Sequence, residues 1–272
     1  MNPDDVEAAF KAFSSSLARN RGYIIQSQTR VFEEPGQLES AIRADSIDLC
    51  IIDTWGYLKS NIGAQLRPYF VSSGPHGPGR TYLLITRRDS GLNTLLALQG
   101  KTLVQCAAAN ASLGPCWLTA LVATNHAQFP DTFFGAIQTV VKPSAAVLPV
   151  FFKKKDACLV DSDAFEVMAE LNPQLGRELQ VVERSEPLVN TVVCLRRSVW
   201  SSDSYKADII KALSELQLEP AGQQILTLFK TGVLVPFTES QLATVRQLQG
   251  GCAATSSLPT TSSLDAFVSL PP

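Results

Sequence analysis

The stretch Pro143-Ser-Ala-Ala-Val-Leu-Pro-Val-Phe-Phe-Lys-Lys-Lys-Asp-Ala-Cys-Leu-Val-Asp161 decides the fold of this chain. Its first part, residues 144–154, is apolar enough to predict a helix, and Phe151 and Phe152 are expected in a core. Residues 157–160 form a short apolar run that predicts a buried strand, and the strand ends on polar residues. A helix and a strand in succession are the parts from which α/β domains are built.

An earlier segment repeats this pattern. Residues 37–44 predict a helix, residues 48–53 predict a strand, and Thr54 and Trp55 form its polar end. Strand and helix patterns alternate along most of the chain, which is typical of sheets covered by helices. Two helix–strand pairs with polar ends predict two α/β lobes that hold a small molecule.

The order of the predicted elements places the lobe boundaries. Lobe 1 is expected to be discontinuous, with residues 1–88 and 187–249, and lobe 2 is expected to comprise residues 89–186. Two chain crossings between lobes are a hinge arrangement. Residues 250–272 are rich in Ser, Thr and Pro, so we expect a flexible tail there.

Composition excludes several classes of function. The 272 residues are 45% hydrophobic and carry a formal net charge of -2, so a nucleic-acid interface is not predicted. No apolar run reaches the roughly 20 residues that span a bilayer. The six cysteines form no C-x-x-C pair, so no metal site is predicted. Cys50, Cys158 and Cys194 lie in apolar strands, where buried thiols are favoured over disulfides.

Catalytic signatures are missing from the sequence. The two histidines, His76 and His126, have no evident partners, and no nucleophile elbow or phosphate-binding loop is present. We therefore predict no enzyme and no cofactor. An enzyme on this scaffold would need a nucleophile, and Cys106 or Cys116 would be the candidate.

Hydroxyl residues at strand-to-helix turns are the candidate ligand groups. Helix N-termini attract anions because their N–H groups are unpaired. Each hydroxyl is equally explained as a helix N-cap, and Trp55, Tyr57 and Tyr82 are either walls of a site or core residues. The hydroxyl candidates are Thr54, Ser112, Ser144 and Ser162.

The chain resembles the solute-binding proteins of phosphate, phosphite and phosphonate ABC transporters, within the type 2 periplasmic-binding superfamily. The resemblance covers about residues 5–248. It rests on Asp48-Leu-Cys-Ile-Ile-Asp-Thr-Trp-Gly-Tyr57, Tyr82-Leu-Leu-Ile-Thr-Arg-Arg-Asp-Ser-Gly91, Leu98-Gln-Gly-Lys-Thr102, residues 144–157 of the opening stretch, and Arg184-Ser-Glu-Pro-Leu188. It implies a two-lobe fold with a hinge and a small polar or anionic ligand held between the lobes.

Ligand residues follow from this resemblance position by position. Tyr57 and Tyr82 match tyrosines that line the family's site, and Asn110-Ala-Ser112 stands at its anion loop. Ser144 stands where several members have a Ser-His pair, but Ala145 replaces the histidine. Asp161 matches an acidic ligand residue. Ser185 lies in the last matching block, and Thr54 and Trp55 lie in the first.

The amino terminus departs from the family pattern, because the chain begins at the first helix. The first strand is expected to be missing, which leaves a sheet edge uncovered. The resemblance implies the ligand-binding component of an ABC transporter, a monomer with a permease as partner and an extracytoplasmic location. Because no signal peptide is visible, a cytoplasmic location stays open. A sensory domain of the same fold that acts through a partner protein is the alternative.

Overall fold

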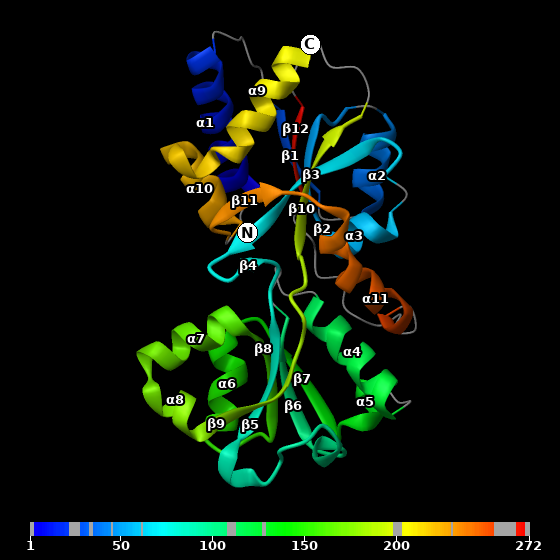
Figure 1. Ribbon diagram of the computed structural model, residues 1–272, viewed down its shortest axis with the longest axis vertical. Coiled ribbons are helices and arrows are strands. Elements are labelled where there is room, and N and C mark those ends of the chain that lie inside the picture. Colours follow the sequence, from blue (N-terminus) through cyan, green and yellow to red (C-terminus); the bar gives the residue numbers. More distant parts are fainter. Residues whose placement is uncertain are drawn as a thin grey trace. The chain divides into compact units, whose positions relative to one another are not determined.

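The structure, a computed structural model, describes residues 3–21, 28–32, 35–44, 46–60, 62–107, 113–126, 129–197, 203–229, 231–252 and 265–269. The chain divides into two compact units (Figure 1). Unit 1 contains Met1–Gly79, Val189–Gln241 and Ser262–Pro272, and unit 2 contains Arg80–Leu188 and Leu242–Thr261. The chain thus passes between the units four times, whereas the sequence predicts two crossings.

The first predicted boundary, at residue 88, lies too far along the chain. The strand β5 (Tyr82–Arg87) pairs with two strands of unit 2 and therefore belongs to that unit. The second boundary lies between Leu188 and Val189, close to the predicted residue 187. The apolar pattern of β5 predicts a strand but not the sheet that contains it. Its pairing with β8 and β9 places it in unit 2.

The helix α11 (Ala243–Cys252) is also placed differently from the prediction, which assigns it to lobe 1. It packs on α4 (Leu113–His126) of unit 2. Val245 is fully buried, and the Thr244 hydroxyl donates a hydrogen bond to the carbonyl oxygen of Pro187 at 3.1 Å. This burial and this hydrogen bond attach α11 to unit 2.

Unit 2 contains a five-stranded sheet with the order β7-β6-β8-β5-β9. The strands β6, β7 and β8 run parallel, and β5 is antiparallel to β8 and β9. In Figure 1, α6, α7 and α8 lie on one side of this sheet and α4 and α5 on the other. The bounds are β6 Thr102–Cys106, α5 Pro130–Phe133, β7 Ala136–Val140, α6 Pro143–Phe151, β8 Ala157–Asp161, α7 Ser162–Leu171, α8 Pro173–Glu178 and β9 Leu179–Arg184, with short 3-10 helices at Arg88–Ser90 and Leu96–Leu98.

The opening stretch forms the predicted helix and strand. The strand β8 is buried along its whole length, and Val147 and Val150 of α6 pack in the same core cluster as Leu83 and Ile85 of β5. The helix ends at Phe151, so Phe152 lies beyond its last turn and is 60% exposed. The expectation that Phe152 is a core residue is therefore wrong.

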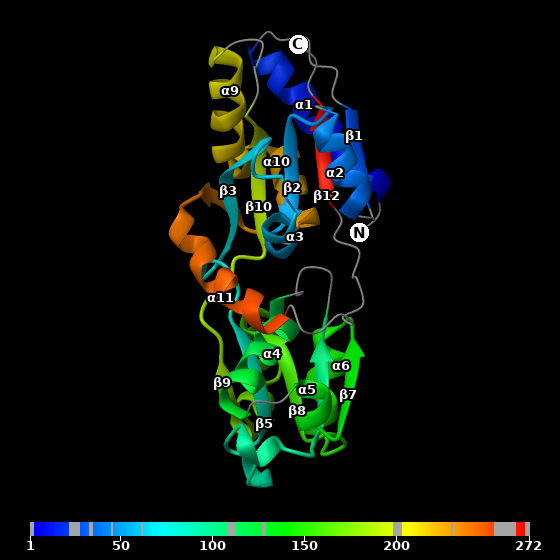
Figure 2. The ribbon, with the colours of Figure 1, turned by 90° about the vertical axis from the view of Figure 1, so that its right-hand side faces the viewer.

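Unit 1 contains a seven-stranded sheet with the order β1-β12-β2-β10-β3-β11, and β4 pairs with β3. Figures 1 and 2 show α1, α9 and α10 together, and their residues share one core cluster with β2, β3 and β10. The bounds are α1 Pro3–Arg21, β1 Gln28–Phe32, α2 Pro35–Arg43, β2 Leu49–Asp53, α3 Thr54–Lys59, β3 Leu66–Gly74, β4 Gly77–Pro78, β10 Thr191–Arg196, α9 Asp203–Ser214, α10 Pro220–Leu228, β11 Val233–Pro236 and β12 Asp265–Ser269, with 3-10 helices at Leu216–Leu218 and Glu239–Leu242.

The strand β12 corrects two expectations about unit 1. It pairs antiparallel with β1 on one side and with β2 on the other, so the sheet continues from β2 to β1 through it. The expectation of a sheet left open by a missing first strand is corrected, because β12 lies between β1 and β2 and the sheet ends at β1. The tail expected to be flexible over residues 250–272 contains the end of α11 and the whole of β12. The segment is rich in Ser, Thr and Pro, and its composition therefore does not indicate a strand. The five residues of β12 form one by pairing with β1 and β2, which are distant in the sequence.

The cysteines of the described residues are buried, as the strand patterns predict. Cys50, Cys158 and Cys194 are 0% exposed, and Cys106 and Cys116 are 2% exposed. All five are thiols rather than members of disulfides. Burial raises the pKa of the Cys158 and Cys194 thiols above the ordinary value, because a buried thiolate loses its hydration.

Candidate functional site

Four of the predicted ligand residues lie at one edge of the unit 2 sheet, here called the polar edge of unit 2. The parallel strands β6, β7 and β8 end at this edge, and antiparallel β5 begins there. Asp161 ends β8 and is the register partner of Tyr82, the first residue of β5. Ser144 follows β7, and Ser185 follows β9 at the same edge. Ligands of open α/β sheets bind at this kind of edge.

Asp161 holds the polar edge of unit 2 together through its carboxylate. One oxygen, Oδ1, accepts a hydrogen bond from the backbone N–H of Ala164 at 3.0 Å, which caps the N-terminus of α7. The same oxygen lies 3.5 Å from a guanidinium nitrogen of Arg80. The Arg80 side chain is 24% exposed and that of Asp161 only 9%, so the ion pair is largely shielded from water. Shielding strengthens the attraction between the two charges.

Tyr82 and Ser185 are connected through the backbone. The N–H of Tyr82 donates to the Ser185 hydroxyl oxygen at 2.8 Å, and the N–H of Ser185 donates to the carbonyl oxygen of Tyr82 at 2.9 Å. The Ser185 hydroxyl donates in turn to the carbonyl oxygen of Glu186 at 2.7 Å. Tyr82 is only 1% exposed, and its ring packs so closely on Gly114 that a Cβ there would lie 2.8 Å from a ring carbon. Both residues therefore have structural roles at this edge.

Of the remaining candidates of unit 2, the structure describes Ser144 but not Asn110 or Ser112. Ser144 is exposed in the first turn of α6, but Lys142 is the N-cap of that helix, so the N-cap interpretation of Ser144 is wrong. Asn110 and Ser112 lie outside the described residues. The anion loop expected from the resemblance therefore stays a prediction.

The candidates of unit 1 follow β2 at the edge of the other sheet, here called the polar edge of unit 1. The N-cap of α3 is Asp53, whose carboxylate accepts from the N–H of Gly56 at 2.8 Å, so Thr54 is not the cap. Thr54 is fully buried, and its hydroxyl oxygen has no hydrogen-bond partner among the described residues. Buried hydroxyls are nearly always paired, so a buried hydroxyl without a partner points to a ligand or a water.

Trp55 and Tyr57 are both half-buried on α3. The Lys59 ammonium lies 4.9 Å from the centroid of the Trp55 ring, a cation–π distance. The Tyr57 hydroxyl lies near Gly63, where an added Cβ would be 3.7 Å from it. Both rings keep part of their surface available, as a wall of a binding site requires.

Two residues of these edges are missing from the sequence prediction. Arg80 forms an ion pair with Asp161, and the backbone carbonyl oxygen of Asn190 accepts a hydrogen bond from the N–H of Thr54 at 2.9 Å. Each lies just ahead of a strand at a chain crossing, Arg80 before β5 and Asn190 before β10. Asn190 lies close to the boundary that the sequence predicts at residue 187, whereas Arg80 is not marked, because the sequence places the first boundary at residue 88.

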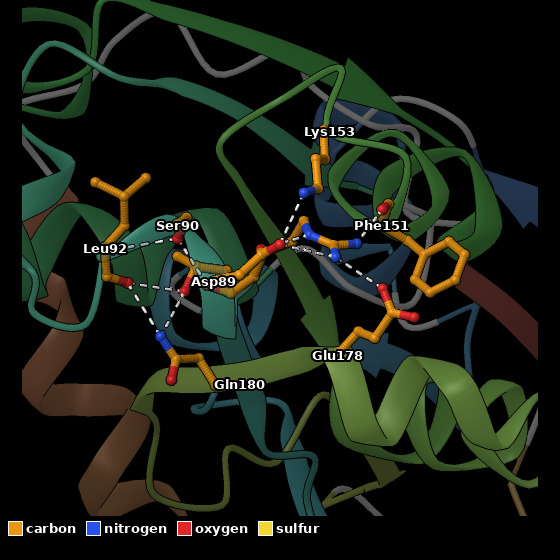
Figure 3. Close-up of polar contacts among 9 residues, drawn as sticks. Asp89, Ser90, Leu92, Phe151, Lys153, Glu178 and Gln180 are labelled. Carbon is orange, nitrogen blue, oxygen red and sulfur yellow. Dashed lines mark hydrogen bonds and ion pairs between the residues drawn. The ribbon is translucent and has the colours of Figure 1, made fainter.

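The opposite edge of the unit 2 sheet carries a cluster of charges (Figure 3). Arg87, at the end of β5, contacts Asp89 at 2.8 Å and Glu178 at 2.7 Å, and it donates to the carbonyl oxygen of Phe151. The Lys153 ammonium lies 2.7 Å from the other oxygen of Asp89. Hydrogen bonds from Arg87 and then from Lys153 lower the pKa of Asp89 well below its ordinary value. The hydrogen bond with Asp89 is the main cause that raises the pKa of Arg87.

Two further observations bear on the type of protein. Within the described ranges, no three or more His, Cys, Asp and Glu residues gather in a way that could hold a metal ion. None of the described helices combines the length and the apolarity that a transmembrane segment requires.

Comparison with known proteins supports a binding fold with two units. Residues 1–242 match the family described as "ABC transporter, phosphonate, periplasmic substrate-binding protein". The chain belongs to this family. The members of this family are the substrate-binding proteins of transporters, so this chain is a substrate-binding protein and not an enzyme. No curated protein matches the chain.

Solved structures show the same fold at low sequence identity. A Xanthomonas citri protein bound to ATP superposes with a TM-score of 0.66 at 15% identity, covering 92% of this chain and 93% of that one. A binding-protein component of an ABC phosphonate transporter from Pseudomonas aeruginosa gives 0.57 at 17% identity, covering 92% and 82%. PhnD1 from Prochlorococcus marinus, in complex with methylphosphonate, gives 0.57 at 14%, covering 92% and 94%. The two-lobe, type 2 periplasmic-binding fold predicted from the sequence is confirmed.

Proposed function

We propose that this protein is the substrate-binding component of an ABC transporter and captures a small phosphorus oxyanion. Membership of the phosphonate-binding family carries the proposal, since it covers residues 1–242. Two of the similar structures hold methylphosphonate and ATP, which share a phosphorus oxyanion. We propose an ABC permease as the protein partner and the periplasm as the place of action.

The polar edges of the two units supply the proposed ligand groups. Two of the chain crossings, at Gly79–Arg80 and Leu188–Val189, lie next to Arg80 and Asn190 in the sequence. A phosphorus oxyanion needs several donors and at least one cation, because charge-assisted hydrogen bonds are the strong ones. Arg80 is the cation of the proposed site, oriented by Asp161. The proposed donors are the hydroxyl or amide groups of Thr54, Asn110, Ser112 and Ser144, with Trp55 and Tyr57 as walls. Ser185 and Tyr82 support the unit 2 part of the site through their mutual hydrogen bonds.

Calorimetric titration tests the ligand class directly. Phosphate, phosphite, methylphosphonate and methanesulfonate are the probes, and the three phosphorus oxyanions are expected to bind more tightly than the sulfonate. At 100 times its dissociation constant, a ligand adds about 2.7 kcal/mol to the free energy of unfolding. An absence of heat and of any thermal shift with all three phosphorus probes would contradict the proposed ligand class.

Thr54→Val separates a binding role of this hydroxyl from a structural one. Removing a buried hydroxyl that has no hydrogen-bond partner among the described residues should raise the unfolding free energy by about 1 kcal/mol. If the hydroxyl contacts the ligand, the affinity falls at the same time. The matched control is Thr119→Val, which removes a buried hydroxyl that donates to Pro115 at 2.9 Å. Thr119→Val is expected to lower the stability and to leave the affinity unchanged.

A further inference from the structure

Two cysteines lie directly opposite each other in the unit 1 sheet. Cys50 of β2 is the register partner of Cys194 of β10, and both are 0% exposed. Side chains of directly opposite residues point to the same face of a sheet, and neighbours along each strand point to the other face. The neighbours Leu49 and Val193 pack in the core cluster with α1, α9 and α10. Cys50 and Cys194 therefore lie side by side on the other face.

The hydrogen bonds of the two strands give the spacing of this pair. The backbone N–H of Thr54 donates to the backbone carbonyl oxygen of Asn190 at 2.9 Å. The backbone N–H of Arg196 donates to the backbone carbonyl oxygen of Asp48, also at 2.9 Å. Opposite residues of an antiparallel ladder are hydrogen-bonded at every second position. The register makes Cys50 and Cys194 one of these hydrogen-bonded pairs. Their Cα atoms are then about 5.5 Å apart, within the range that disulfides adopt.

We propose that Cys50 and Cys194 are a disulfide-forming pair that is oxidised while the unit 1 sheet forms. The bond would join the two longest segments of unit 1, Met1–Gly79 and Val189–Gln241, which are separated in the sequence by Arg80–Leu188 of unit 2. The family to which the chain belongs is periplasmic, and the periplasm is a compartment in which disulfides form.

The oxidant in this proposal is a small disulfide such as oxidised glutathione. The thiolate of Cys50 attacks one glutathione sulfur, and the first glutathione leaves as a thiol. The thiolate of Cys194 then attacks Cys50 Sγ and displaces the second glutathione. Two electrons pass from the protein thiols to the glutathione disulfide, and the two thiol protons end on the two reduced glutathiones.

The folded sheet protects the pair from this reaction. Both thiols are inaccessible, and burial raises the pKa of Cys194, so little of the reactive thiolate exists at neutral pH. Oxidation therefore requires an open sheet, either during folding or in partial unfolding. Fully native, reduced protein is expected to resist the same oxidant.

Unit 2 offers an internal control pair of equal burial. Cys106 of β6 and Cys158 of β8 belong to one core cluster, and the register partner of Cys158 is Val104. Cys106 is thus displaced by two residues along its strand. The spacing between strands and the rise per residue place the two Cα atoms about 8 Å apart, too far for a disulfide without backbone movement. Refolding with the oxidant should leave Cys106 and Cys158 as free thiols.

The test is a cycle of unfolding and refolding of the full chain with reduced and oxidised glutathione. Each refolded sample is alkylated under denaturing conditions and digested with trypsin without reductant. Residues 44–59 and 185–196 are tryptic peptides with one cysteine each, so their linkage is unambiguous. We expect this linked pair after refolding with oxidant and separate alkylated peptides from native protein treated with the same oxidant.

Variants connect the linkage with stability. Oxidative refolding is expected to raise the midpoint of thermal unfolding of the unchanged protein and of Cys158→Ala, but not that of Cys194→Ala. Recovery of folded protein with both thiols alkylated after the oxidative cycle would overturn the proposal. So would linkage of either cysteine to another partner, or loss of refolding whenever the oxidant is present. The peptide map of the unchanged protein decides the question even if Cys194→Ala does not fold.

Discussion

The two edges of the unit 2 sheet differ in the way they use charge, although one strand, β5, connects them. At the opposite edge Arg87 is held by two carboxylates and a carbonyl oxygen, and Lys153 adds a second cation (Figure 3). At the polar edge Arg80 shares Asp161 with the N-terminus of α7. The opposite edge is a closed network of short ion pairs. The polar edge has a longer ion pair beside hydroxyl and backbone groups.

This difference teaches what each edge can do. A cation with two nearby carboxylates is already compensated, so an anion from solution gains little from it. The ion pair of the polar edge is longer, at 3.5 Å, and the N–H groups at helix N-termini favour anions there. We therefore propose a stabilising role for the opposite edge and ligand binding at the polar edge.

The largest expected effect comes from Gly135→Ala at the opposite edge. A Cβ at this position would collide with the carbonyl oxygen of Gly100, and backbone cannot move aside as a flexible side chain can. The free energy of unfolding, measured with urea, should fall by about 3 kcal/mol. The control is Gly176→Ala in α8, where the nearest atom to an added Cβ is 3.9 Å away. An unchanged stability of Gly135→Ala would show that the Gly100 turn is looser than described.

Next in size is the effect of Arg80→Gln on ligand affinity. Charge-assisted hydrogen bonds contribute about 1.5–3 kcal/mol, so the affinity for methylphosphonate should fall by roughly tenfold or more. Calorimetric titration measures it. Arg88→Gln is the matched control, because Arg88 is exposed and lies beyond the end of β5. Equal affinities for Arg80→Gln and the unchanged protein would remove the assignment of binding to the polar edge.

Arg87→Gln should show the reverse behaviour. It leaves Asp89, Glu178 and the Phe151 carbonyl oxygen without their shared donor, and the stability should fall by about 1 kcal/mol. The two carboxylates are 51% and 41% exposed, so water compensates much of the loss. Ligand affinity should not change. A loss of affinity as large as that of Arg80→Gln would contradict the division of roles between the edges.

The smallest expected effect is the acid dependence of the opposite edge. The folded state lowers the pKa of Asp89, chiefly through the hydrogen bond from Arg87. A lowered pKa stabilises the fold above the unfolded value, about 3.9, and this contribution is lost as the pH falls below that value. Urea unfolding at pH 6 and pH 3 measures it. Asp89→Asn should lose less stability over this interval than the unchanged protein, and an identical loss in both proteins would contradict the assignment.

Local sequence signals predict the helices of unit 2 well. The sequence predicts helices over residues 113–126 and 162–171, and these are the bounds of α4 and α7. Asn172 and Pro173 stop the second of these helices, because the residue before a proline avoids the helical conformation. The helix caps are predicted less well. Asp53 and Asp161, rather than Thr54 and Ser162, accept the N–H groups of α3 and α7.

Non-local pairing limits the rest of the prediction. The resemblance proposes Tyr82, Asp161 and Ser185 as ligand residues, and the strand pairing shows that they share one edge of the unit 2 sheet. Their role as ligand residues stays a prediction. The partnership of Arg80 with Asp161 joins segments far apart in the sequence, so no local pattern indicates it. The sequence does not indicate the strand β12 for the same reason, since its five residues pair with β1 and β2, which are far away in the sequence.

The place of β12 in the sheet also sets an order of folding. All strands of unit 2 lie between Tyr82 and Arg184, so its sheet can assemble as soon as that stretch has left the ribosome or the export channel. The unit 1 sheet needs β12, whose last residue is Ser269, to connect β1 with β2. Unit 1 therefore stays incomplete through most of synthesis. During that interval its strand edges are unpaired, which is an aggregation hazard.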